Sequence, residues 1–196
     1  MLMSGLDALK QDHYPLWLCL SFEKPERRAL LADLLLFAFT LDRAIAVTKE
    51  PLLRQIRLQW WVEMFETGAA KGVPLAERLL DHAARHDLPV ESFMQHWFDA
   101  CDKDQPEALN NCLDGWVYML GWLAVGQGKS CDDIARNIGR IANHLEVRPL
   151  EKPKDYRSLS GFFQAAFWLI KRQQESPSTP DDKRLAFYLF RKILFG

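Results

Sequence analysis

The 196-residue chain lacks an excess of charge of either sign, since 25 Lys and Arg residues stand against 26 Asp and Glu, for a formal net charge of −1. Without a basic surplus, and without any of the recurring DNA- or RNA-binding motifs, nucleic acid is not an expected partner. Long apolar runs are also missing. The longest uncharged stretches, 115–128 and 158–170, are shorter than the roughly eighteen residues that a membrane-spanning helix needs. We therefore expect a cytoplasmic protein that is not transmembrane.

Cysteine and glycine motifs are absent as well. The four cysteines have no Cys-x-x-Cys spacing, and no basic start followed by a long apolar core marks a secretory signal peptide. Buried free thiols in a reducing compartment are therefore expected. No Gly-rich phosphate loop and no Ser-His-Asp or Cys-His arrangement stands out, so the sequence predicts neither a nucleotide loop nor a nucleophilic catalytic centre.

What the sequence does contain is a helical pattern along its whole length. Apolar residues recur three and four positions apart, prolines stand at the starts of these segments, and no alternating β-branched stretch suggests a hairpin. With 48% hydrophobic and 26% charged residues, the composition is that of a globular protein. The pattern predicts one all-α domain over residues 1–196, a helical bundle with helices at 14–21, 25–47, 51–65, 74–86, 90–101, 108–125, 131–146, 160–174 and 180–194.

The most informative stretch contains Phe37-Ala38-Phe39 and, after Pro51, the block Arg57-Leu58-Gln59-Trp60-Trp61. It resembles the squalene/phytoene synthase family, in which an aromatic-Ala-Phe turn opens a helix with an Asp-rich motif and a Pro-started helix follows with an Arg-Leu-Gln-Trp-Trp-like block. The turn His86-Asp87-Leu88-Pro89 adds to the resemblance, which is strongest over 25–101, weaker to 147 and faint over 148–196. It implies a bundle of the isoprenoid synthase type, shortened at its C-terminal end.

Both Asp-rich motifs of that family are missing from this chain. In register with the family, the two metal-binding carboxylates of the first motif would stand at positions 44 and 48, which hold Ala44 and Thr48. Near the second motif the nearest acid is Glu146, and the residue four positions later is Leu150. Magnesium is normally held by one or two carboxylates together with substrate phosphates. The resemblance without these ligands predicts a pseudoenzyme with no metal site and no cofactor.

The residues themselves lead to the same expectation. After its first turn, the predicted helix 25–47 offers only Asp33 and Asp42, which lie about 13 Å apart along a helix axis and cannot share one ion. Asp42 and Glu146 are the weak candidates for catalytic acids. For Asp42 the alternative is an ordinary ion pair with a nearby Arg.

A set of six residues is predicted to line a ligand pocket: Phe39, Asp42, Arg57, Trp60, Trp61 and Asn143. Arg57 shares a helix face with one of the two Trp residues, so its guanidinium could contact a diphosphate or another anionic head group while the indoles wall an apolar pocket. The alternative is structural, with both Trp residues in the core and Arg57 paired with Asp42 or Glu63.

The C-terminal segment Leu185–Phe195 is short, aromatic, basic and amphipathic. This composition is typical of a helix that docks onto a partner or lies at a membrane interface. The alternative is a helix that packs back onto the bundle.

These observations favour a non-catalytic, squalene/phytoene synthase-like protein that acts by binding. It would hold an isoprenoid or lipid-like ligand, or present its aromatic helices to a protein partner at the membrane surface. The family includes non-enzymatic relatives, among them an assembly factor, and the missing carboxylates place this chain closer to that branch. One alternative is a divergent Mg²⁺-dependent transferase acting on farnesyl or geranylgeranyl diphosphate. Another is a helical adapter without a pocket. A continuous apolar cavity between the helices that carry Asp42, Arg57 and Asn143 would favour a ligand, and a filled centre would favour the adapter.

Overall fold

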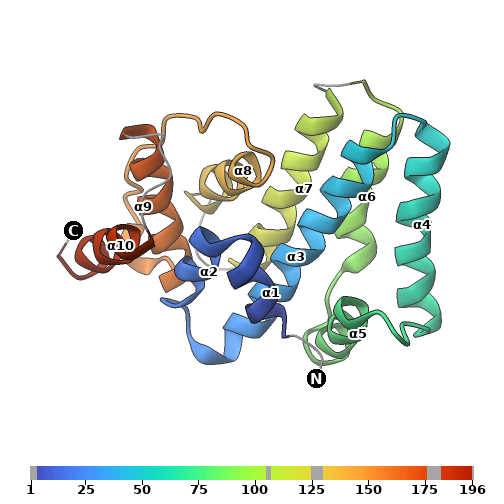
Figure 1. The fold of residues 1–196 in the computed structure, drawn as a ribbon, viewed down its shortest axis with the longest axis horizontal. Helices are drawn as coiled ribbons and strands as arrows, with labels where there is room; N and C mark the ends of the chain where they lie inside the picture. Colours follow the sequence, from blue (N-terminus) through green and yellow to red (C-terminus); the bar gives the residue numbers. More distant parts are fainter. Residues whose placement is uncertain (1–3, 105–106, 125–129, 176–181, 196) are drawn as a thin grey trace.

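The computed structural model describes residues 4–104, 107–124, 130–175 and 182–195, and every regular element in these ranges is helical (Figure 1). The elements are α1 (Gly5–Asp12), α2 (Tyr14–Leu20), α3 (Pro25–Val47), α4 (Pro51–Thr67), α5 (Pro74–His86), α6 (Val90–Cys101), α7 (Glu107–Leu123), α8 (Ser130–Ala142), the 3-10 turn η1 (Tyr156–Ser158), α9 (Gly161–Glu175) and α10 (Asp182–Phe195). The all-α class is thus confirmed for these residues. None of the helices described here combines the length and the apolar character that crossing a bilayer requires.

Proline sets the starts of three consecutive helices. Pro25, Pro51 and Pro74 each occupy the first turn of their helix, α3, α4 and α5. The position suits proline because its fixed φ is already helical and its missing N–H would have no partner there. Gly68 then ends α4 with a φ of 67°, a left-handed conformation that glycine adopts without a steric penalty.

The largest differences from the sequence expectation are at α1 and at the end of α8. The helix α1 was not predicted, although Ser4 caps it by accepting a hydrogen bond from the Asp7 N–H at 3.2 Å. The helix α8 ends at Ala142 rather than at 146, because His144 has a φ of 54°. A side-chain-bearing residue in that left-handed conformation stops a right-handed helix.

The helix α3 forms the middle of the molecule, with α4 and α5 toward one end and α9 and α10 at the other (Figure 1). Seven of its apolar residues are at most 1% exposed: Leu31, Ala32, Leu34, Leu35, Phe37, Ala38 and Leu41. A helix that is apolar nearly all round must be covered on all sides. Its buried acid Asp33 holds α5 against it, because Oδ1 accepts a hydrogen bond from Arg78 Nε at 2.8 Å and Oδ2 lies 3.1 Å from His82 Nε2.

The C-terminal helix α10 packs back onto α9 and α2. Leu185 and Leu189 are 2% and 0% exposed and form its inner face, whereas Phe187 and Phe190 are 67% and 54% exposed. Of the two alternatives for segment 185–195, the structure therefore shows packing onto the bundle, with two outward Phe rings. The side chains of the last two residues of this segment lie outside the described part of the chain.

All four cysteines, Cys19, Cys101, Cys112 and Cys131, are free and buried. Burial raises the pKa of Cys101 to about 11 and that of Cys131 to about 12. At neutral pH these two thiols therefore keep their protons and are poor nucleophiles.

Candidate functional site

The carboxylate of Asp42 is buried at the point where α3, α6, α7 and the end of α8 meet. Its Oδ1 accepts a hydrogen bond from the indole N–H of Trp97 at 2.8 Å. Its Oδ2 accepts from the indole N–H of Trp116 at 2.7 Å and from the side-chain amide of Asn143 at 2.8 Å. One acid thus joins helices that are far apart in the sequence.

Asp42 is held by neutral donors. Burial raises its pKa, and hydrogen bonds from Trp97, Trp116, Asn143 and the Cys112 thiol oppose that rise. The predicted ion pair with an Arg is wrong, because two indoles and an amide occupy the places that a guanidinium would take. A carboxylate has about four acceptor sites, and these donors use them, so Asp42 has none left to offer a metal ion.

Aromatic rings fill the space around this carboxylate. Trp97 and Trp116 are both 0% exposed. The ring of Phe39 stacks on His13 with 3.6 Å between centroids and meets Trp116 edge-on at 5.3 Å. A Cβ added to Gly115 would come within 2.5 Å of the Trp97 ring, so α7 can approach this closely only with glycine there. The centre beside Asp42 is therefore packed solid.

The other three predicted pocket residues, Arg57, Trp60 and Trp61, belong to a separate groove between α3 and α4. This groove has a volume of about 570 Å³ and is lined by Thr40, Arg43, Ala44, Val47, Ile56, Arg57, Trp60 and Trp61. The helix α3 directs Asp42 toward α6 and α7 and Ala44 toward α4, as their angular separation on a helix requires. The six candidates thus fall into two groups on different faces of α3.

The two indoles of the groove have different roles. Trp61 is 6% exposed and packs edge-on against Phe37 with 5.1 Å between ring centroids. Trp60 is 45% exposed and meets Trp61 at 5.3 Å in a T-shaped pair. The core interpretation therefore holds for Trp61, whereas Trp60 remains at the surface.

Two guanidinium groups border this groove, those of Arg43 and Arg57. Both side chains are exposed, and among the ion pairs of the described residues neither has an acidic partner. The predicted pairing of Arg57 with Asp42 or Glu63 is therefore not formed. Sequence reasoning missed Arg43, whose place one position after Asp42 on a helix puts it on the neighbouring face.

Arg54 shows by contrast what a structural arginine looks like in this protein. It is buried, and it donates to the backbone carbonyls of Thr48 at 2.6 Å, Cys101 at 3.0 Å and Lys103 at 3.1 Å. These bonds fasten α4 to the ends of α3 and α6. Sequence reasoning missed this residue because its acceptors are backbone carbonyls.

An uncovered apolar stripe extends from the groove along α4. Leu52, Ile56 and Trp60 recur four positions apart and are 66%, 55% and 45% exposed, with Leu53 at 45% and Val47 at 63% beside them. Contiguous exposed apolar patches mark interaction surfaces in soluble proteins. The groove and the stripe together give the α3–α4 face an apolar floor with basic edges.

The remaining sequence candidates do not assemble into a metal site. Ala44 lies on the floor of the groove, Thr48 is buried at the end of α3, and Glu146 is exposed. Glu146 lines a different cavity of about 700 Å³ between the end of α8 and α9, so it shares no site with Asp42. In the ranges that the structure describes, no three His, Cys, Asp or Glu side chains gather closely enough to hold a metal ion.

Comparisons with family models, curated proteins and solved structures give no match to this chain. The fold and the site define an all-α bundle with aromatic rings packed around Asp42 and a basic, aromatic groove between α3 and α4.

Proposed function

We propose that this protein is a non-catalytic, squalene/phytoene synthase-like bundle that acts by binding an amphipathic anion in the groove between α3 and α4. Such a ligand has an isoprenoid or lipid-like chain and a phosphate or carboxylate head group. One observation carries the proposal: Arg43 and Arg57, without acidic partners among the described residues, border an apolar groove that ends on the exposed indole of Trp60.

The chemistry of the groove fits both parts of this ligand. A guanidinium is always charged near neutral pH and binds phosphate or carboxylate with two parallel hydrogen bonds. Ala44, Val47 and Ile56 supply apolar contacts for a chain. The volume of about 570 Å³ lies within the range of roughly 300 to 1,000 Å³ that is usual for ligand sites.

The absence of prenyl transfer is supported by the packed centre. Asp42 accepts hydrogen bonds from N–H and S–H donors at all of its acceptor sites, and positions 44 and 48 hold no carboxylate. A carbocation also needs a cavity that excludes water, and the buried rings of Trp97 and Trp116 fill the space beside Asp42. Binding without turnover therefore fits the residues better than a divergent transferase does.

Calorimetric titration of the full chain with farnesyl monophosphate, with farnesol as the analogue without a head group, tests this function. We expect the phosphate to bind and to raise the melting temperature, and farnesol to bind at least about tenfold more weakly because it makes no charge-assisted bonds. The double variant R43A/R57A should lose a similar factor in affinity for farnesyl monophosphate. Ala44→Phe should block the groove.

Arg184→Ala is the matched control for the double variant, because Arg184 is an exposed arginine of α10 at the other end of the molecule. It should bind farnesyl monophosphate like the wild type. Equal loss in R184A and in R43A/R57A, or unchanged binding in Ala44→Phe, would place the ligand elsewhere and contradict the proposal.

The filled centre favours a second candidate function, a helical adapter without a ligand. In that case the stripe of Leu52, Ile56 and Trp60 covers a helix of a partner, in the manner of anchors spaced along a helix face. Farnesyl monophosphate would then leave the melting temperature unchanged at every concentration.

A further inference from the structure

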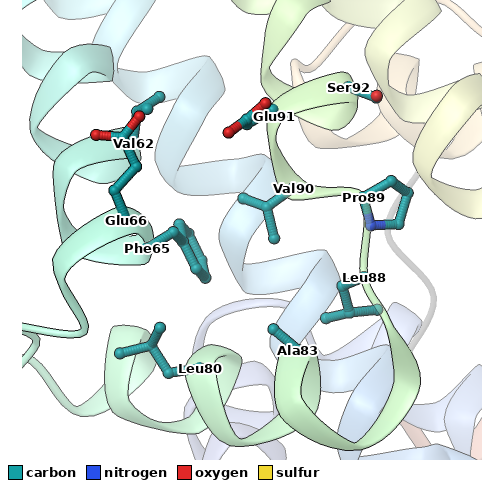
Figure 2. Close-up of a pocket in the computed structure, with 10 residues that line it drawn as sticks. All are labelled: Val62, Phe65, Glu66, Leu80, Ala83, Leu88, Pro89, Val90, Glu91 and Ser92. Carbon is teal, nitrogen blue, oxygen red and sulfur yellow. The ribbon is translucent and has the colours of Figure 1, made fainter.

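A second cavity, on the other side of α4, lies between α4, α5 and the start of α6 (Figure 2). It has a volume of about 320 Å³. Its walls are apolar and come from all three elements: Val62, Phe65, Leu80, Ala83, Leu88 and Val90. Arg43, Arg57 and the indoles of the α3–α4 groove take no part in it.

The rim of this cavity is anionic. Glu66 from α4 and Glu91 from α6 both line the cavity, and their carboxylates lie on the same side of it (Figure 2). Both side chains are exposed. Within the described ranges no Lys, Arg or His pairs with either of them. Two carboxylates on one rim give the mouth of the cavity a negative potential, which favours a cation.

We propose that this cavity is a binding site for a small organic cation, an aryl- or alkyl-ammonium compound. Its apolar body occupies the space between Phe65, Leu80 and Val90, and its ammonium group lies between Glu66 and Glu91. An ammonium group donates up to three hydrogen bonds, and bonds between charged partners are shorter and stronger than neutral ones. A cavity of about 320 Å³ is near the lower end for ligand sites, which selects a compact ligand.

This site is independent of the function proposed for the α3–α4 groove. The groove has two cationic side chains and selects an anion, whereas this cavity has two anionic side chains and selects a cation. If the cation does not bind, only the proposal for this cavity fails. If the anion does not bind, only the proposal for the α3–α4 groove fails.

Phenethylamine is the probe, and its binding to the full chain is followed by amide chemical shifts and by calorimetry. We expect shift changes to cluster on residues 62–66, 80–83 and 88–92. Phenethyl alcohol, which has nearly the same shape without the charge, should bind at least about tenfold more weakly, because it makes no charge-assisted bond. The variants Glu66→Gln and Glu91→Gln should each lose a similar factor in affinity for phenethylamine, because each removes one charged partner of the ammonium group.

Two further variants keep the test decisive. Glu63→Gln removes an exposed acid from the same helix α4 that does not line the cavity, and it should bind phenethylamine like the wild type. Ala83→Leu fills the cavity and should abolish binding while the melting temperature shows that the bundle remains folded. Equal affinity for the amine and the alcohol, loss of amine binding in Glu63→Gln, or shift changes outside these segments would overturn the proposal.

Discussion

At the scale of single residues, Asp42 shows how an acid is used for structure in this bundle. It is a buried acid, and its hydrogen-bond partners are the uncharged donors of Trp97, Trp116 and Asn143. Buried donors that lose their acceptor keep their full desolvation penalty. The side chain is therefore expected to stabilise the fold whether or not the protein has any activity.

Replacing Asp42 by Ala is expected to lower the free energy of unfolding by roughly 3 to 5 kcal/mol, because the buried indole N–H groups of Trp97 and Trp116 and the half-buried amide of Asn143 lose their acceptor at about 1 kcal/mol or more each. Urea denaturation followed by circular dichroism measures this change. The control is Glu63→Ala, an exposed acid of α4, which should stay within about 0.5 kcal/mol of the wild type. Equal stability of Asp42→Ala and Glu63→Ala would show that the network carries no energy.

Sequence reasoning identified several residues of interest but not their grouping. Phe39, Asp42 and Asn143 do come together, and so do Arg57, Trp60 and Trp61, but on different faces of α3. The pattern of a helix fixes which residues share a face, whereas the neighbour that covers each face depends on tertiary packing. Trp97 and Trp116 were missed for that reason, since in the sequence they are ordinary apolar positions of amphipathic helices.

At the scale of elements, the junction of α1 and α2 covers one side of α3. His13 lies between these two short helices and stacks on Phe39 of α3 at 3.6 Å. Burial lowers the pKa of His13, the neighbouring charge of Asp12 opposes this, and His144 adds to the lowering. The stacked ring is thus favoured in its neutral form.

This shift gives a pH dependence with a definite sign. As the pH falls below the ordinary value of 6.5, the unfolded chain takes up a proton that the folded protein takes up only at lower pH, so stability decreases on acidification. His13→Phe keeps the stack without the titration. Its melting temperature should therefore fall less than that of the wild type between about pH 7.5 and pH 5. Parallel curves for the two proteins would contradict the assignment.

The starts and ends of helices could be predicted where a residue at that position favours a start or an end. The starts of α3, α4 and α5 follow from Pro25, Pro51 and Pro74, and the end of α4 follows from Gly68. The end of α8 did not follow, because His144 takes a left-handed φ that no local signal in its side chain requires. Helix α1 had a signal, Ser4 with Asp7 three residues later, and it was overlooked.

At the scale of the whole molecule, aromatic rings are packed around Asp42 inside the bundle, and two candidate ligand sites lie at its surface. Its long axis runs from α4 and α5 to α9 and α10 (Figure 1). The two candidate ligand sites both lie at one end of this axis and share α4 as a wall. The all-α class was predictable from periodicity, whereas the packed centre was not, because a helical pattern does not reveal whether large rings meet or leave space.

We expect the full chain to release no diphosphate from farnesyl or geranylgeranyl diphosphate in the presence of Mg²⁺. The reason is that Asp42 has no acceptor site left for a metal ion, and that Glu146 lines a cavity between the end of α8 and α9, which Asp42 does not line. A coupled assay for diphosphate, compared with a reaction without protein, measures this. Release that exceeds the blank and disappears in Glu146→Gln would establish the divergent transferase instead.

The hydrogen bonds to Asp42 have a consequence for how the chain reaches this structure. They join residues 55, 74 and 101 positions apart, and contacts of such separation require the closure of long loops before they return any energy. We therefore expect the network around this carboxylate to be completed late in folding, after its donors have come together. A substitution of Asp42 is then expected to raise mainly the rate of unfolding and to change the rate of folding little.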